Sequence, residues 1–152
     1  MSAADIHHAT FTIDRELRIV PARAFRFWAD RDLKERWTAC HPDWRVLDEA
    51  FDFRAGGTEA KRWQTPDGRE QTFAAHYLDI VEPGRIVYAF EMSFGGERIS
   101  ASLATVALRP EEGQTRMIYT EQIAYFGIRE ALEARIAGTG EGFERLARML
   151  AA

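Results

Sequence analysis

Hydrophobic and polar residues alternate imperfectly over residues 10–20, which is typical of a half-buried strand. Pro21 then suits the first turn of a helix, and the bulky hydrophobic residues after it give that helix one apolar side. Asp30 is suited to cap a second short helix that ends at about Trp37. The pattern therefore predicts a strand followed by a pair of short helices.

The middle of the chain reads as strands separated by turn residues. Glycine adopts positive φ at little cost and proline ends a strand, so each separator favours a reversal of the chain. The separators are Gly56-Gly57, Pro66-Asp67-Gly68, Pro83-Gly84, Gly95-Gly96 and residues 110–113. The strands expected between them cover residues 44–53, 58–65, 70–81, 85–94, 97–109 and 114–124. With the first strand, they predict a curved antiparallel sheet of about seven strands.

From about residue 129 to residue 150, hydrophobic residues recur near helical spacing with charged residues between them. This predicts one long amphipathic helix at the end of the chain. Gly138, Gly140 and Gly142 each cost a helix about 1 kcal/mol relative to alanine. Three such residues indicate either a break in the helix or a close approach of its backbone to the sheet, and the sequence leaves both open.

Composition narrows the class of protein. The chain has 152 residues, of which 46% are hydrophobic and 29% charged, and no segment divides it, so we expect a single domain over residues 1–152. A net charge of −4 with interspersed signs excludes the basic surface that nucleic-acid binding needs. No hydrophobic run is long enough for a membrane span, and the first ten residues do not read as a signal peptide. With Cys40 as the single cysteine, a cytoplasmic location is expected.

The order of these elements and several short segments resemble a known family. The segments are Arg15-Glu16-Leu17, Pro21-Ala22, Phe25 to Trp28, Glu35-Arg36-Trp37, Arg54-Ala55-Gly56-Gly57, Pro66-Asp67-Gly68, Glu82 to Tyr88, Thr115 to Glu121 and Gly142 to Leu150. Together they are similar to the activator of heat-shock-protein-90 ATPase homologue-like family of the SRPBCC (START-like) superfamily. The resemblance implies an α+β helix-grip fold, with the sheet wrapped around the C-terminal helix and a cavity between them, and it implies no cofactor.

Alternation along the strands gives candidates for the lining of that cavity, since residues of one parity face the helix. In the strand at 85–94, the parity that leaves Glu91 outside points Ile86, Tyr88, Phe90 and Met92 inward. In the strand at 70–81, the parity that leaves Asp79 outside points Ala74, His76, Leu78 and Ile80 inward. The complete set of predicted ligand contacts is Trp37, Trp44, Trp63, His76, Tyr88, Phe90, Met92, Tyr119, Glu121 and Phe143.

Three functions are compatible with such a site. The first is binding of a small apolar or aromatic ligand, oriented by a few polar groups. The second is catalysis of the kind that polyketide cyclases, dehydratases or hydrolases perform, with Glu121, His76 and Tyr88 as candidates, because a buried carboxyl group that no cation pairs can act as a general acid or base. Buried Glu and His are more often structural, which favours binding without catalysis. The third is a chaperone contact in a stress response, by analogy with the protein that names the family.

Other chemistry is poorly supported by the sequence. His7-His8 and Cys40-His41 lack partners at the spacing of zinc ligands, so no metal site is predicted. Exposed edge strands could pair in a homodimer. The predicted partners are therefore a small apolar ligand, a second copy of the chain and a chaperone, with no nucleic acid and no membrane.

Overall fold

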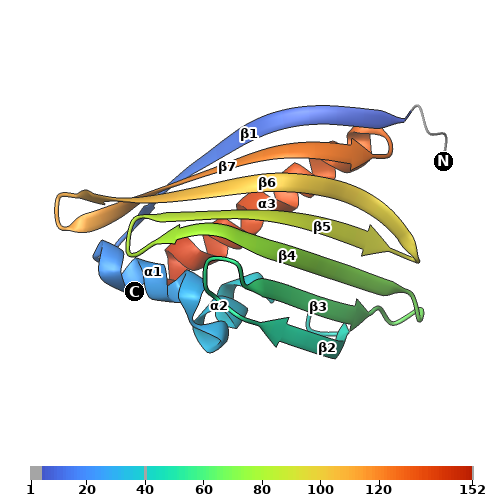
Figure 1. Cartoon of the computed structure of the whole chain (residues 1–152), viewed down its shortest axis with the longest axis horizontal. Coiled ribbons are helices and arrows are strands. Elements are labelled where there is room, and N and C mark those ends of the chain that lie inside the picture. The colour runs from blue at the N-terminus through green and yellow to red at the C-terminus, as the bar shows by residue number, and fades with distance from the viewer. Residues whose placement is uncertain (1–4, 40, 152) are drawn as a thin grey trace.

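A computed structural model describes residues 5–39 and 41–151, so Cys40 lies outside the described residues. In this part of the chain, seven strands and three helices form (Figure 1). The strands are β1 (Ile6–Leu17), β2 (Arg45–Phe51), β3 (Thr58–Gln64), β4 (Glu70–Val81), β5 (Arg85–Phe94), β6 (Glu97–Glu111) and β7 (Gln114–Phe126). The helices are α1 (Pro21–Ala29), α2 (Arg31–Thr38) and α3 (Arg129–Met149).

All seven strands form one antiparallel sheet in the order β1-β7-β6-β5-β4-β3-β2. Six of them follow one another as a meander, and β1 returns the beginning of the chain to the edge beside β7. The sheet is curved, α3 crosses its inner face, and α1 and α2 lie at one end (Figure 1). The predicted helix-grip arrangement of sheet and C-terminal helix is confirmed, while the cavity expected between them stays a prediction.

The two short helices begin where the sequence indicates. Pro21 occupies the first turn of α1. Asp30 caps α2, since its Oδ1 accepts the backbone N–H of Asp32 at 3.0 Å and of Leu33 at 3.4 Å. Asp30 also ends α1, so a single extended residue separates the two helices. Trp28 and Trp37, the buried tryptophans of the pair, therefore point toward each other under the sheet.

A β-bulge in β4 overturns the predicted orientation of that strand. Tyr77 pairs with Tyr88 and Asp79 pairs with Val87, which leaves Leu78 as an extra residue. Before the bulge Ala75 and Tyr77 are buried, whereas His76 is exposed and Leu78 is 55% exposed. The prediction that Ala74, His76 and Leu78 face inward is wrong, while Ile80 does pack on the core because the bulge shifts the alternation by one residue.

The three glycines near the C-terminus do not interrupt α3, which runs continuously from Arg129 to Met149. Nothing lies within 4 Å of a β-carbon added to Gly138, and the nearest atom at Gly140 is the Cδ1 of Ile13 at 4.0 Å. Of the two alternatives, a break is therefore excluded, and neither position shows a tight approach to the sheet.

Replacing Gly138 with alanine is expected to raise the free energy of unfolding by about 1 kcal/mol, because the helix gains propensity and the new methyl group meets open space. Urea denaturation followed by circular dichroism measures this change. Gly56→Ala is the control. Gly56 has a φ of 85°, which alanine adopts only with strain, so this variant should have a lower free energy of unfolding. A Gly138→Ala variant no more stable than the wild type would contradict the prediction.

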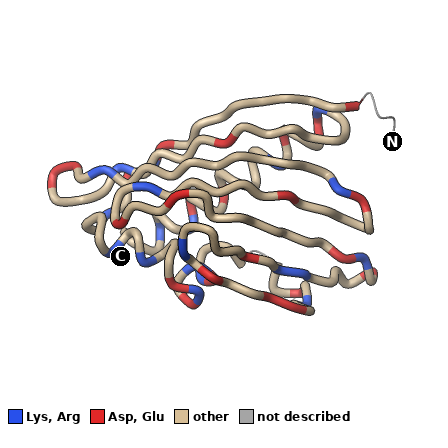
Figure 2. The backbone as a smooth tube through the Cα atoms, in the orientation of Figure 1, with Lys and Arg blue, Asp and Glu red and all other residues tan. Residues whose placement is uncertain are grey.

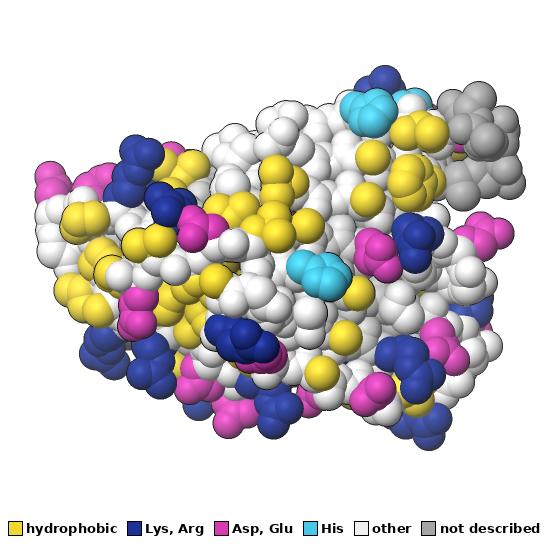
Figure 3. All heavy atoms as spheres, in the orientation of Figure 1, with side chains coloured by type: hydrophobic (Ala, Val, Ile, Leu, Met, Phe, Trp, Pro, Cys, Tyr) yellow, Lys and Arg dark blue, Asp and Glu magenta, His cyan; other side chains and the backbone are white. Residues whose placement is uncertain are grey.

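The residues of the main hydrophobic core come from the sheet and from all three helices. Charged residues gather mostly at turns, at strand ends and around α2, β2 and β3 (Figure 2). Over the middle of the outer sheet face, hydrophobic and uncharged polar groups predominate (Figure 3). Among the described residues, no helix has the length and hydrophobicity needed to cross a membrane.

Candidate ligand site between the sheet and the helices

Aromatic rings from all three helices meet under the sheet. The ring of Trp28 on α1 lies 4.9 Å from that of Trp37 on α2 and 5.9 Å from that of Phe143 on α3. Phe143 in turn lies 4.7 Å from the ring of Tyr119 on β7. On the other side, Trp28 is 6.4 Å from Tyr88 on β5. The interior is thus a continuous aromatic cluster that joins the helices to the centre of the sheet.

A buried carboxylate lies within this cluster. Glu121 on β7 is 0% exposed. Its Oε1 accepts the hydroxyl of Tyr119 at 2.6 Å, and its Oε2 accepts the hydroxyl of Ser102 at 2.6 Å and Nη2 of Arg135 at 3.0 Å. Three donors, one of them a cation, therefore satisfy both oxygens of this buried side chain. Ser102 comes from β6 and Arg135 from α3, so the group fixes the helix to the sheet.

Arg135 links the carboxylate of Glu121 to Ser100 on β6. Its Nη1 donates to the hydroxyl of Ser100 at 3.1 Å, and its guanidinium lies 5.5 Å from the ring centroid of Phe90. Sequence reasoning placed Arg135 among the polar residues of the amphipathic helix and missed this role. The available signal was its spacing, since it lies between Leu132 and Ile136, which both pack on the sheet side of α3.

A second buried ion pair lies at the α2 end of the sheet. Nζ of Lys34 is 2.7 Å from Oε1 of Glu59 on β3, and the two side chains are 12% and 14% exposed. The hydroxyl of Tyr77 donates to the same oxygen at 2.5 Å. Lys34 also lies 5.7 Å from the ring centroid of Trp28. Alternation alone does not reveal this group, because the predicted parity of β4 places Tyr77 on the outer face.

Three inner tyrosines have hydroxyl groups that resist ionisation. Burial is the main cause of a pKa far above the ordinary value of 10 at Tyr77, Tyr88 and Tyr119. The negative charge of Glu59 raises the pKa of Tyr77 further, and that of Glu121 raises the pKa of Tyr88 and Tyr119. These groups therefore serve as neutral hydroxyls in the interior.

Most of the predicted ligand contacts come together. Those buried in or beside the main core are Trp37, Tyr88, Phe90, Tyr119, Glu121 and Phe143. Met92 is half-buried and packs against them. Trp63 is half-buried on β3, where Lys61 Nζ lies 5.4 Å from its ring centroid, and it stays outside the hydrophobic core.

Two predicted contacts lie elsewhere. Trp44 belongs to the turn before β2, not to a strand, and stacks on His41 with ring centroids 4.0 Å apart. Strand alternation therefore does not apply to it. His76 points to the outer face of β4, because the buried parity there is that of Ala75 and Tyr77. Neither residue contributes to the interior site.

The geometry removes the premise of the catalytic hypothesis. That hypothesis needs Glu121 to be buried without a cation, and Arg135 supplies one at 3.0 Å. His76, its second candidate, faces away from Glu121. Among the described residues, no group of three His, Cys, Asp or Glu side chains is placed to hold a metal ion. The homodimer and the chaperone contact stay predictions.

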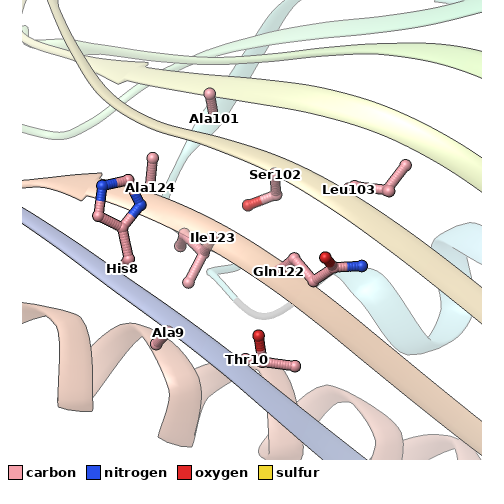
Figure 4. Close-up of a pocket in the computed structure, with 9 residues that line it drawn as sticks. All are labelled: His8, Ala9, Thr10, Ala101, Ser102, Leu103, Gln122, Ile123 and Ala124. Atoms are coloured by element: carbon pink, nitrogen blue, oxygen red, sulfur yellow. The ribbon is translucent and has the colours of Figure 1, made fainter.

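At least two hollows open on the surface of the described residues. One, of about 600 Å³, lies over β1, β6 and β7 on the face turned away from α3, and its walls include His8, Thr10 and Gln122 (Figure 4). The other, of about 410 Å³, lies beside α1, and Phe25, Phe53 and Ile80 from the core line it. Only the second reaches core residues that belong to the aromatic cluster, since Phe53 lies 4.9 Å from Tyr77.

Comparison with known proteins gives a family and close structural relatives. The family model described as activator of Hsp90 ATPase homolog 1-like protein matches residues 18–152. An uncharacterised protein from Rhizobium leguminosarum is 44% identical over 95% of each chain, with a TM-score of 0.87. A protein from Rhizobium loti is 38% identical over 94% of this chain and 97% of its own, with a TM-score of 0.85. No curated protein matches.

Proposed function

Since the chain belongs to the activator of Hsp90 ATPase homolog 1-like family of the SRPBCC superfamily, we propose that it binds a small, mostly apolar ligand between the sheet and the helices. The observation that carries this proposal is the buried Glu121–Arg135 pair inside an aromatic interior. Taking two charges out of water is costly, and apolar residues of similar size often replace a buried pair without loss of stability. A few fixed polar groups among aromatic rings are what a ligand pocket requires.

Access to this interior is expected beside α1. The hollow there is lined by Phe25 and Phe53, whose rings are 5.6 Å apart, and Phe25 lies one helical turn from Trp28. Separation of these two rings would connect the hollow to the Trp28 ring. The rim carries Arg26 and Asp30, whose charged groups are 3.5 Å apart at the surface. The deep end of the path is apolar, so burial of ligand surface supplies the affinity.

Thermal shift measurements with acetonaphthone, a small neutral aromatic ketone, test the proposal. At a concentration about one hundred times its dissociation constant, a ligand of the native state stabilises it by about 2.7 kcal/mol. For a chain of this length that raises the melting temperature by about 5 to 10 °C. No shift with this ketone or with larger polycyclic ketones, steroids and flavonoids would contradict the proposal.

Two alanines of β6 provide a matched pair of variants. Ala104 is 0% exposed on the inner face between Tyr88 and Glu121, whereas Ala101 is exposed in the outer hollow. We expect Ala104→Val to weaken binding at least about tenfold, because the added methyl groups occupy the interior. Ala101→Val should keep the wild-type affinity. The opposite result would place the ligand on the outer face.

A further inference from the structure

One buried hydrogen-bond donor in the interior has no acceptor. Among the described residues, Nε1 of Trp28 is the buried side-chain nitrogen or oxygen that makes no hydrogen bond. The Trp28 side chain is 2% exposed, so bulk water does not satisfy this N–H. Buried polar groups are nearly always paired in native proteins, and an orphan donor calls for an explanation such as a bound molecule.

The neighbouring tryptophan shows that the local structure can satisfy an indole N–H. Nε1 of Trp37 donates to the backbone oxygen of Phe27 at 2.8 Å. The rings of Trp28 and Trp37 are only 4.9 Å apart, and both side chains are almost fully buried. The missing acceptor is therefore a property of the Trp28 position, where the surrounding rings include Tyr88 and Phe143.

The charges of the interior indicate which ligand would complete this position. Glu121 is paired with Arg135, and Glu59 with Lys34, so these two interior carboxylates already have a cation beside them. An ionised ligand would bring a further charge beside these neutralised pairs, which is unfavourable in an apolar interior. An indole N–H can only donate, so the ligand must present an acceptor.

We propose that the ligand is a neutral aromatic molecule with an acceptor oxygen, of the ketone, ester or quinone type, which takes the hydrogen bond of Trp28 Nε1. This inference rests on the proposed function and adds the chemical class of the ligand and the residue that selects it. The rings of Trp28, Trp37 and Phe143 contact the body of the molecule. Phe25 lies one helical turn from Trp28 on α1, so separation of the Phe25 and Phe53 rings would open a path from the hollow beside that helix to the donor.

Three probes of similar size separate the contributions of the acceptor oxygen, the aromatic rings and a negative charge to the affinity. Acetonaphthone carries the acceptor, ethylnaphthalene lacks it, and naphthoate replaces it by a charge. For the wild-type protein, we expect isothermal titration calorimetry to give an affinity for the ketone about tenfold higher than for the hydrocarbon, as for one hydrogen bond to a buried donor. Naphthoate should bind more weakly than the ketone. A preference for naphthoate, or equal affinity for ketone and hydrocarbon, would overturn the inference, and the latter would mean that the N–H holds only a trapped water.

Trp28→Phe and Trp37→Phe are the matched variants, because each removes an indole N–H and keeps an aromatic ring. Trp28→Phe should bind the ketone and the hydrocarbon with equal affinity. Trp37→Phe should change both affinities alike and keep their ratio, since its N–H is already bonded to Phe27. Retention of the ratio in Trp28→Phe would also overturn the inference.

A second readout covers the case in which Trp28→Phe does not fold. In the NMR spectrum of the wild-type protein, the indole N–H signal of Trp28 should move downfield with acetonaphthone and not with ethylnaphthalene. Equal movement with both probes would contradict the hydrogen bond. If none of the probes binds, the proposed function itself fails, whereas binding without discrimination leaves that function standing and removes only the role of Trp28.

Discussion

Replacing Glu121 with glutamine is expected to lower the free energy of unfolding by about 3 kcal/mol, because it leaves the Arg135 cation largely buried without its counter-charge. The amide also presents a donor where the carboxylate accepts from Ser102 and Tyr119. Under the catalytic hypothesis, the same variant would lose activity and keep its fold. The ion pair instead makes it a test of stability, measured by urea denaturation.

The control for this prediction removes both charges. A double variant, Glu121→Met with Arg135→Met, replaces the pair by side chains of comparable length that pack on the aromatic cluster. Because an unpaired buried charge is the main cost of the single change, the double variant should recover most of the lost stability. If the two single changes proved additive in the double variant, Glu121 and Arg135 would not be coupled and the described pairing would be contradicted.

The protein is expected to unfold in a narrow range of alkaline pH as its inner tyrosines are forced to ionise. Tyr77, Tyr88 and Tyr119 have pKa values raised above 10 in the folded state, mainly by burial. Below pH 10 both states keep these protons, and the stability is unaffected by them. Above it the unfolded state loses them while the folded state does not, so stability falls with pH. Three such groups together remove roughly 4 kcal/mol per pH unit.

Alkaline titration followed by tyrosinate absorbance and by circular dichroism measures this effect. The absorbance of the three inner tyrosines should rise together with the loss of the far-ultraviolet signal. Tyr88→Phe should make the fall of stability with pH less steep by about one third, since it removes one of the three groups. Ionisation of all tyrosines before any loss of structure would contradict their burial.

Turn and capping residues made most of the fold predictable. Pro21 and Asp30 located the two short helices, and glycine-containing turns such as Gly56-Gly57 located the strands to within a few residues. The first strand begins four residues earlier than the predicted Thr10, at Ile6, because its pairing with β7 extends to Phe126. That pairing joins β1 to the last strand of the meander, so the sequence of β1 alone does not indicate where the strand begins.

The site was less predictable because it depends on contacts between distant elements. Glu121 and Tyr119 followed from simple alternation in β7, which is regular. Alternation failed in β4, where the extra residue Leu78 shifts the register and no glycine or proline marks the bulge. The spacing of Arg135 next to Leu132 and Ile136 indicates the sheet side of α3, but its pairing with Glu121 follows only from the approach of the helix to β7.

The central claim is that a small neutral ligand binds inside the aromatic cluster, and titration with acetonaphthone followed by the indole N–H signals in NMR tests it most directly. The chain has four tryptophans, of which Trp28 and Trp37 are buried in the cluster and Trp44 lies outside it. The account predicts that the signals of Trp28 and Trp37 shift with the ligand while that of Trp44 stays in place. Saturable binding that shifts Trp44 and leaves Trp28 and Trp37 unchanged would contradict it.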